Sequence, residues 1–242
     1  MKVLIACEFS GTVRDAFDAR GHDAWSCDLL PDLKGSNRHI RDDVRNVLDW
    51  GWDLMMVAHP PCTRLCNSGV RWLSEPPTKL EAAHYSPQEV ADYADMTRDQ
   101  RLAFMWQKLD EGAELFSDLW NAPIDRIAVE NPVMHKHAKA RIRGYQPQAQ
   151  TIQPWHFGEE AFKATCLWLK GLPTLEATNR LTPPEKGTEA HKAWSFIHQA
   201  TPGADRWKLR STFFPGIADA MADQWGRTCP DHREPEQLQL AI

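Results

Sequence analysis

The stretch Asp53-Leu-Met-Met-Val-Ala-His-Pro-Pro-Cys62-Thr-Arg-Leu-Cys66 decides how the fold is interpreted. Its apolar residues, 54–58, form a short continuous run that is typical of a strand buried on both faces of a parallel sheet. Pro60 and Pro61 end this strand, because a proline donates no hydrogen bond to a sheet and restricts the residue before it. The next side chain is the thiol of Cys62, which we expect in the crevice beyond the carboxyl end of the strand, where open α/β sheets bind ligands.

The thiol of Cys62 has two interpretations on this stretch alone. Its display at the end of a parallel strand favours a nucleophile. However, free cysteine is also among the most buried residue types and often acts as a small apolar side chain. The choice between them depends on the rest of the chain.

The composition is that of a globular protein. The chain has 242 residues, of which 42% are hydrophobic and 25% charged, enough for one domain or for one domain with a small lobe. No apolar run is long enough to span a bilayer, and residues 1–6 are typical of a strand rather than of a signal peptide. Six scattered cysteines do not resemble a disulfide framework, so we expect reduced thiols in a cytoplasmic protein that does not bind membranes.

The distribution of charge permits binding to nucleic acid. A net charge of −5 argues against a protein that coats nucleic acid, but affinity for phosphates depends on local patches. Residues 131–158 contain no acidic side chain, and a second basic cluster lies within residues 206–210. The cations of these two segments are Lys136, Lys139, Arg141, Arg143, Arg206, Lys208 and Arg210. Such runs are also typical of an ordinary solvated surface.

The order of the predicted elements indicates a parallel α/β sheet. Short apolar runs alternate with segments of helical periodicity, as in βαβ units. The predicted strands are residues 2–7, 23–27, 54–58 and 124–129. The predicted helices are residues 12–20, 43–50, 96–120 and 213–225.

The remaining segments are less regular. Residues 64–97 are predicted to form a long loop with a short helix, and loops of this length are usually functional or disordered. Residues 135–143 are expected to form a basic helix or turn. Two further candidate strands, 150–153 and 165–169, are joined by a hairpin-like turn, and residues 171–210 show no clear period.

Polar residues follow several of the predicted strands. They are Phe9-Ser10-Gly11, Asp28, Asp43, Cys62 and Glu130-Asn131. Because parallel strands end at the same edge of a doubly wound sheet, we expect these residues to converge on one crevice. The turn at Ser10 and Gly11 suits close approach to a ligand. Asp28 suits ribose hydroxyls, although a plain turn former also fits there.

A thiolate paired with a carboxylic acid suggests covalent activation of an electron-poor ring. The thiolate is the reactive form, so its pKa has to be lowered by its surroundings, for which Arg64 or a helix N-terminus is available. Glu130 would then protonate or hydrogen-bond the ring as negative charge develops on it. The other interpretation of Glu130 is a carboxylate at the surface rim or at a helix cap, which its place at a buried strand end disfavours.

The ordered motifs of the chain resemble those of DNA cytosine-5 methyltransferases. They are Glu-Phe-Ser-Gly, a strand-end Asp, Pro-Pro-Cys, Glu-Asn-Pro, Phe-Gly with a following Lys-x-Thr, and a final Phe-Pro-Gly-Ile-Ala-Asp-Ala-Met-Ala helix. The resemblance spans nearly the whole chain and looks closest to the compact methylases encoded by bacteriophages. It implies a Rossmann-like class I S-adenosylmethionine-dependent methyltransferase fold, with a mostly parallel seven-stranded sheet and a much reduced target-recognition region.

The resemblance implies S-adenosylmethionine as the cofactor. The positions that match the family's cofactor site are Glu8, Phe9, Ser10, Gly11, Asp28, Asp43 and Pro60. Among them, residues 9–11 resemble the cofactor loop. Asp28 resembles the carboxylate on the ribose, and Asp43 resembles the carboxylate near the adenine amino group.

The resemblance also implies the catalytic roles. Cys62 matches the nucleophile that adds to C6 of cytosine, and Glu130 matches the glutamate that contacts N3 and the exocyclic amine. The activated C5 then takes the methyl group, for which the base has to leave the duplex. The other matching positions are Asn131, Pro61, Thr212 and Lys163. The expected contacts to double-stranded DNA are Arg64, Arg71, Lys136, Lys139, Arg141, Arg143, Arg206 and Lys208.

Several positions depart from the family pattern. Where the family has Gln-x-Arg-x-Arg, the chain has residues 161–165, so that Lys163 stands for the first arginine and the second has no cationic replacement. The glycine loop is shorter than usual, and Ser211-Thr212 stand in place of Gly-Asn. The brief variable segment, 171–210, predicts short or relaxed sequence recognition.

These comparisons predict a division of the chain into three parts. Residues 1–170 and 211–226 are expected to form the catalytic domain, residues 171–210 to read DNA, and residues 227–242 to form a flexible tail. We expect a monomer without a bound metal, in the host cytoplasm if the protein is encoded by a phage.

Other classes of protein compete with this interpretation. A zinc deaminase needs H-x-E followed by P-C-x-x-C, whereas this chain has one residue too many between Cys62 and Cys66 and its only H-x-E at 232–234. A structural zinc site from His59, Cys62 and Cys66 lacks a paired second half. The remaining alternatives are a DNA-binding protein of this fold without chemistry, and a related enzyme with another one-carbon donor or an RNA acceptor.

Overall fold

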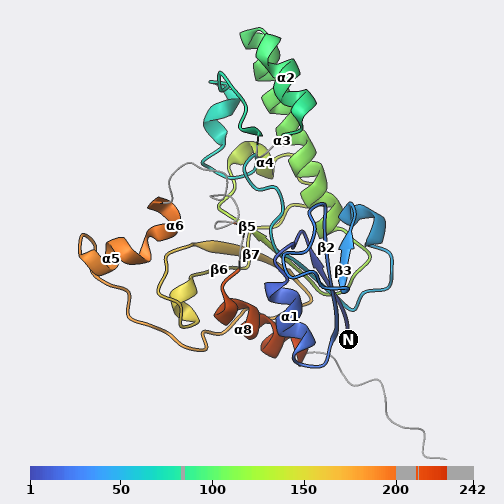
Figure 1. The fold of residues 1–242 in the computed structure, drawn as a ribbon, viewed down its shortest axis with the longest axis vertical. Helices are drawn as coiled ribbons and strands as arrows, with labels where there is room; N and C mark the ends of the chain where they lie inside the picture. Colours follow the sequence, from blue (N-terminus) through green and yellow to red (C-terminus); the bar gives the residue numbers. More distant parts are fainter. Residues whose placement is uncertain (83–84, 200–210, 212, 228–242) are drawn as a thin grey trace, which may run out of the picture.

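The computed structural model describes residues 1–82, 85–199, 211 and 213–227, and one seven-stranded sheet lies at its centre (Figure 1). The strands follow the order β3-β2-β1-β4-β5-β7-β6 across the sheet. Their bounds are β1 (Lys2–Ala6), β2 (Asp23–Asp28), β3 (His39–Arg41), β4 (Leu54–Val57), β5 (Ile127–Asn131), β6 (Gln150–Ile152) and β7 (Thr165–Lys170).

The sheet is mostly parallel. The neighbours from β3 through β5 all pair in parallel, whereas β7 pairs antiparallel with both β5 and β6. The fold is therefore mixed α/β and consistent with a Rossmann-like architecture, as the alternation of strands and helices predicted.

The central strands are apolar because both of their faces are buried. In β4, Met55 and Val57 belong to the apolar cluster on one face, and Leu54 and Met56 belong to the cluster on the other. All four side chains are 0% exposed. This placement confirms that the run 54–58 is a strand buried on both sides.

Helices cover both faces of the sheet (Figure 1). On one face, α1 (Thr12–Asp18) and α8 (Pro215–Gly226) pack side by side. The long α3 (Arg98–Trp120) contributes its apolar stripe to the other cluster. A capping box between Thr97 and Gln100 fixes the beginning of α3, since each side chain satisfies a free backbone N–H of the first turn.

The shorter helices lie in the connections. They are η1 (Val44–Val47), η2 (Val70–Leu73), α2 (Pro87–Asp95), α4 (Lys136–Lys139), η4 (Pro154–His156), α5 (Glu189–Trp194) and α6 (Phe196–Gln199). The predicted loop 64–97 thus contains η2 as well as the expected short helix, which is α2.

Two predictions about strands need correction. The sequence pattern missed β3, because three residues at the edge of a sheet carry too little apolar signal. The strands predicted at 150–153 and 165–169 do pair antiparallel, but not through a tight turn. Residues 153–164 connect them and include η4.

Residues 171–199 reach outward from the sheet and carry α5 and α6 (orange in Figure 1). Backbone hydrogen bonds anchor this segment, from Leu181 N–H to the Trp155 carbonyl at 2.9 Å and from Phe162 N–H to the Trp194 carbonyl at 3.0 Å. The two short helices had no recognisable period in the sequence. Residues 200–210 and the tail beyond residue 227 lie outside the described residues.

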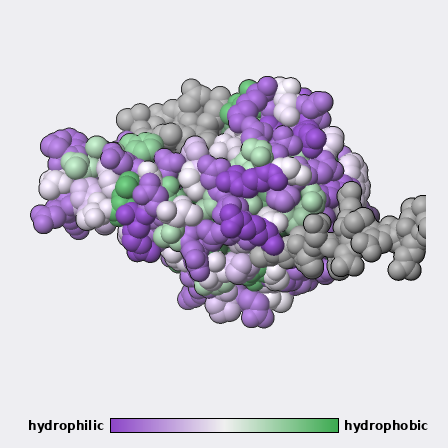
Figure 2. Space-filling view, turned by 90° about the horizontal axis from the view of Figure 1, so that it is seen from below, coloured by the Kyte–Doolittle hydropathy of each residue, from purple (hydrophilic) through white to green (hydrophobic). Residues whose placement is uncertain are grey.

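None of the helices in the described ranges combines the length and the apolar character that a bilayer span requires. The face of the molecule in Figure 2 carries mostly hydrophilic side chains, and apolar ones gather there only in small areas.

Trp225 anchors α8, and its truncation tests the packing of this layer. The side chain is 0% exposed, and its indole N–H donates to the Pro173 carbonyl at 3.0 Å. We expect Trp225→Ala to lower the free energy of unfolding by about 3–5 kcal/mol, through lost burial and the cavity left behind. Trp50→Ala, at a side chain that is 51% exposed, is the matched control and should cost about 0.5 kcal/mol or less. If urea denaturation shows that both variants lose the same free energy of unfolding, this packing is contradicted.

Candidate active site

The sheet brings the ends of three neighbouring strands into one row. Ala6 of β1 is paired with Val57 of β4, which is paired with Val129 of β5. The residues that follow these positions therefore lie next to one another at the carboxyl edge of the sheet. The edge collects the segments that begin at Cys7 and Glu130, with the segment of Cys62 between them.

The loop that carries Cys62 is tightly wound. The Cys62 carbonyl accepts hydrogen bonds from the backbone N–H groups of Leu65 at 2.9 Å and of Cys66 at 3.0 Å. Gly69 packs so closely on this turn that a Cβ there would overlap the carbonyl oxygen of Thr63. Cys62 itself is half-buried, so its thiol is neither sealed in the core nor fully exposed.

Backbone hydrogen bonds join this loop to the segment after Glu-Asn-Pro. Asn67 N–H donates to the Val133 carbonyl at 3.0 Å, and His135 N–H donates to the Leu65 carbonyl at 3.0 Å. Between these bonds, Cys66 and Met134 form an isolated antiparallel bridge. The motifs Pro-Pro-Cys and Glu-Asn-Pro, which are far apart in the sequence, are thus fixed against each other.

Glu130 is a buried carboxyl near the carboxyl end of β5. It lies in β5 opposite Leu167 of β7 and is 6% exposed. Burial raises the pKa of Glu130 to about 7, the negative charge of Cys66 adds to the rise, and the positive charge of Lys163 opposes it. A carboxyl with this pKa can donate a proton near neutral pH.

Lys163 reaches the same place from the segment before β7. Its backbone N–H donates to Gln153 Oε1 at 3.1 Å, and its Nζ lies 5.8 Å from the centre of the Phe213 ring. The electrostatic influence of Lys163 on both Glu130 and His59 places the cation within this cluster. Lys163 and Glu130 thus lie close enough to interact, and the neighbour of Glu130 in the thiol loop is Cys66.

Two buried polar atoms of the cluster lack a partner. Within the described parts of the chain, only His59 Nε2 and Asn131 Oδ1 are buried side-chain nitrogen or oxygen atoms without a hydrogen bond. Burial and the neighbouring Lys163 hold the pKa of His59 well below its usual value, so its ring is neutral. A buried polar atom without a partner costs about 1–3 kcal/mol, which is tolerated chiefly at sites that bind something.

His59 was considered in the sequence only as a zinc ligand. Its position directly before Pro-Pro, at the end of a buried strand, was the available signal. The ring packs against Phe213 with 5.0 Å between centres. No group of three or more His, Cys, Asp or Glu side chains suited to a metal ion occurs in the part of the chain that is described, and this covers the trio His59, Cys62 and Cys66.

A second cluster lies beside β1 and β2. Cys7 follows β1 with a φ of 55°, which is unusual for a residue other than glycine. Its pKa is raised by burial and by the negative charges of Asp28 and Asp43, so the three side chains are near neighbours. Asp28 is partly buried, which raises its pKa, and it accepts a hydrogen bond from Leu30 N–H at 2.9 Å. Asp43 caps η1 by accepting from Arg45 N–H at 3.0 Å.

Glu8 proves to be a structural residue. Its carboxylate accepts hydrogen bonds from the N–H groups of Val13 at 2.7 Å and Arg14 at 3.1 Å, and from the Ser10 hydroxyl at 3.2 Å. These bonds cap the first turn of α1, and the side chain of Glu8 is 0% exposed. The sequence pattern could not show this role, because the cap comes from a residue that precedes the helix by four positions.

The turn between β1 and α1 is compact. Gly11 has a φ of 69°, and the guanidinium of Arg14 fills the space where a Cβ would stand. Phe9 and Pro60 are buried, whereas Pro61 is exposed. The guanidinium of Arg14 thus lies against this turn, a contact that the sequence analysis did not consider.

The basic segment after residue 135 carries less free charge than its composition suggests. Lys136 and Lys139 are exposed on α4. Arg141 forms an ion pair with Asp110 at 2.5 Å, and Arg143 forms one with Asp118 at 2.6 Å. These aspartates belong to α3, so the neutralising partners are far away in the sequence.

The two arginines near Cys62 lie on aromatic rings. The half-buried Arg64 stacks over Tyr85 at 4.9 Å, and the exposed Arg71 stacks over Trp72 at 4.1 Å. The predicted contacts Arg206 and Lys208, and Thr212 as well, lie outside the described residues.

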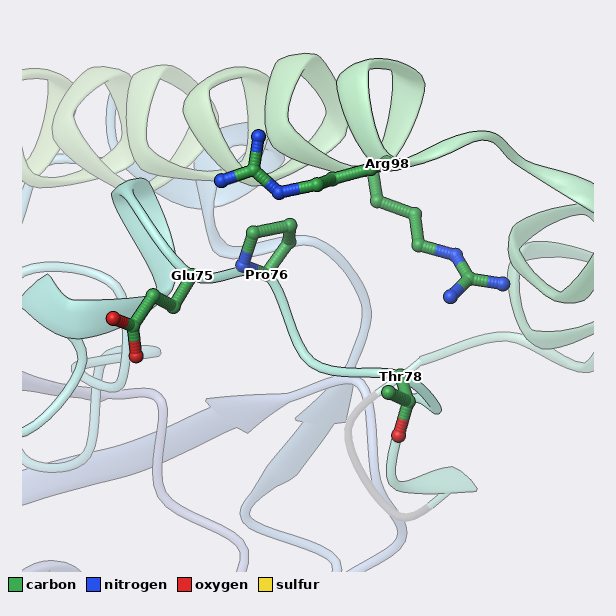
Figure 3. Close-up of a pocket in the computed structure, with 5 residues that line it drawn as sticks. Glu75, Pro76, Thr78 and Arg98 are labelled. Carbon is green, nitrogen blue, oxygen red and sulfur yellow. The ribbon is translucent and has the colours of Figure 1, made fainter.

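A cavity of about 330 Å³ opens elsewhere, between the loop after η2 and the first turns of α3 (Figure 3). Its lining residues are Glu75, Pro76, Thr78, Arg98 and Arg101. None of them belongs to the two clusters at the sheet edge, so this hollow is separate from the candidate site.

No model of a known protein family matches this sequence, and no curated protein is significantly similar to it. The function therefore has to be argued from the site itself.

Replacement of Glu130 tests whether burial holds this carboxyl in its protonated form. The pKa of Glu130 in the folded protein is about 7, above the usual 4.5. Between these values the folded protein keeps a proton that the unfolded chain loses, so its free energy of unfolding falls as the pH rises, by about 3 kcal/mol in total. Glu130→Gln removes this dependence, and the variant should be more stable than the original protein at pH 8 but not at pH 4.5.

Urea denaturation at both pH values measures this difference. Glu176→Gln, at an exposed glutamate, is the control and should behave like the original protein. An effect of Glu130→Gln that is the same at pH 4.5 and at pH 8 would show that the carboxyl is not held protonated.

Proposed function

We propose that this protein is a DNA cytosine-5 methyltransferase, which transfers a methyl group from S-adenosylmethionine to C5 of a cytosine turned out of the duplex. One observation carries the proposal. The half-buried thiol of Cys62 is fixed by backbone hydrogen bonds against the segment of Glu130, a buried carboxyl whose pKa of about 7 suits a proton donor. A mostly parallel seven-stranded sheet is also what the resemblance to this family implies.

The two side chains divide the work of activating the ring. Cys62 as a thiolate adds to C6, and the electron pair of the C5–C6 double bond moves toward N3. Glu130 in its protonated form gives N3 a proton or a strong hydrogen bond, which stabilises the charge that develops there. C5 of the resulting adduct is electron-rich and attacks the methyl group. Loss of the C5 proton to water, release of Cys62 as a thiolate and return of the N3 proton to Glu130 then restore the aromatic ring and the acid.

S-adenosylmethionine supplies the electrophilic methyl group when it is bound. The carboxylates of Asp28 and Asp43 are suited to its ribose hydroxyls and adenine amino group, because Asp28 is a half-buried acceptor at the end of β2 and Asp43 is one shortly after β3. Both charges act on Cys7, which follows β1, and β1 is paired with the β4 strand that leads to Cys62; this supports one binding crevice along the sheet edge. Glu8 takes part only by holding the turn before α1 in place.

Lys163 balances the charge of the site. It stands where the family has an arginine, and its cation interacts with Glu130. A positive charge at this point favours the anionic intermediate and limits how far the pKa of Glu130 rises. The unpaired His59 Nε2 and Asn131 Oδ1 offer further hydrogen bonds to a base in the same pocket.

The DNA surface in this proposal is small. The exposed Lys136 and Lys139 are available for phosphates, whereas the ion pairs of Arg141 and Arg143 reduce their contribution. Residues 171–199 extend outward from the sheet (Figure 1), and in this proposal they are available for the remaining contacts. Few contacts to bases favour the short or relaxed recognition that the sequence predicts.

Transfer of labelled methyl groups tests the proposal. The protein is incubated with labelled S-adenosylmethionine and double-stranded DNA, with single-stranded RNA in a parallel reaction. We expect incorporation into DNA, and we expect Cys62→Ala to lower it by about 1,000-fold or more, because the sulfur that forms the adduct is removed. Cys166→Ser is the matched control, since this thiol is buried in β7 beside Thr151, and should retain activity.

Two results would contradict the assignment. Absence of methyl transfer to either nucleic acid by a folded protein that binds the cofactor would exclude a methyltransferase. Equal transfer by Cys62→Ala would exclude covalent catalysis at this residue. Methylation of RNA alone would keep the chemistry and change the acceptor.

A further inference from the structure

The steps described above use Cys62 and leave a second thiol of the same loop without a role. Cys66 lies one turn further on, and its backbone N–H donates to the Cys62 carbonyl at 3.0 Å. This backbone bond places the two residues one turn apart, and hydrogen bonding with the Cys62 side chain is the largest cause of the lowered pKa of Cys66. Cys66 is only 6% exposed, whereas Cys62 is half-buried, so a molecule arriving from the pocket meets Cys62 first.

Both protonation states of Cys66 have partners in the loop. As a thiolate, Cys66 accepts from the thiol of Cys62 and from the Ser68 hydroxyl, whose oxygen is 3.0 Å away. As a thiol, it donates to the carbonyl oxygen of Thr63 at 3.7 Å. Gain or loss of the proton thus requires no rearrangement of the backbone.

Charged groups from each neighbouring element act on Cys66. Arg64 of the same loop and His135 at the start of α4 interact favourably with its negative charge. Glu130 of β5 is the opposing group, because the charge of Cys66 raises the pKa of that carboxyl. The hydrogen bond from Cys62, helped by Ser68 and by the backbone N–H groups of Ser68 and Gly69, lowers the pKa of Cys66 against the effect of burial.

We propose that Cys66 is the base that accepts the proton of Cys62 when Cys62 attacks the ring. This inference rests on the proposed function, because it requires Cys62 to be the nucleophile. The S–H bond of Cys62 breaks and its proton forms an S–H bond on the thiolate of Cys66, while the freed electron pair of Cys62 forms the bond to C6. On release of the product, Cys62 leaves with this electron pair and takes the proton back from Cys66.

Sharing one proton between two sulfurs has a clear advantage. The pair already carries one negative charge at neutral pH, so the nucleophile arises by movement of a proton along an existing hydrogen bond. The same charge helps to keep Glu130 protonated, so that the site holds a thiolate and a carboxylic acid together. One pair of thiols therefore prepares both reactants of the addition step.

The rate of Cys62 alkylation by iodoacetamide across pH 4 to 10 tests the pair without DNA or cofactor. The protein is kept reduced with a phosphine, and mass spectrometry of the Cys62 peptide separates this site from the other thiols. We expect half-maximal rate near pH 5, the value to which the pKa of Cys66 is lowered. In Cys66→Ser the half-maximum should move up to about pH 8.5, the range of an ordinary thiol.

A second variant keeps the proposal testable if Cys66→Ser does not fold. Ser68→Ala removes one donor to Cys66 at an exposed position and should shift the half-maximum upward by less than Cys66→Ser does. An original protein whose Cys62 reacts only above pH 8 would overturn the proposal, as would profiles that neither variant moves.

The alkylation experiment and the methyl-transfer experiment can fail independently of each other. A low and Cys66-dependent half-maximum in a protein without methyl transfer would refute the function and leave the shared proton intact. Methyl transfer together with an ordinary Cys62 profile would refute the role of Cys66 alone.

Discussion

The backbone hydrogen bonds between the Cys62 loop and residues 133–135 are the constraint on which the candidate site depends. The proposed reaction needs both motifs, because a thiol without an acid cannot activate a ring and an acid without a nucleophile has nothing to assist. The bridge between Cys66 and Met134 holds the two loops together, beyond the ends of paired strands. The parallel sheet brings the two loops to the same edge, and these backbone hydrogen bonds fix the loops relative to each other.

The charges of the site depend on one another in the same way. Burial raises the pKa of Glu130, Lys163 limits this rise, and the negative charge of Cys66 adds to it. Removal of one member would change the protonation of the others, which is how neighbouring groups divide acid and base roles in one pocket. His59 Nε2 and Asn131 Oδ1, which are buried without a hydrogen bond in the described structure, lie in this same part of the molecule.

The sequence was most informative where local pattern and burial agree. The apolar run at 54–58 identified β4, and Cys62 follows this strand as predicted. The sequence ended the next strand at residue 129, whereas β5 continues through Glu130 to Asn131. The sequence did not predict the roles of side chains whose partners are set by tertiary contacts. The cap of α1 by Glu8 and the pairing of Arg141 with an aspartate of α3 depend on segments that meet only in the folded chain. A list of cations therefore overstated the charge available for DNA.

The most direct measurement of the central claim is covalent trapping on DNA in which every cytosine carries fluorine at C5. Fluorine cannot leave as a proton does, so methyl transfer from S-adenosylmethionine would lock the enzyme onto the base. The account predicts a complex that survives denaturation and carries the base on Cys62. Absence of a complex with protein that binds both DNA and cofactor, or attachment at another residue, would contradict it.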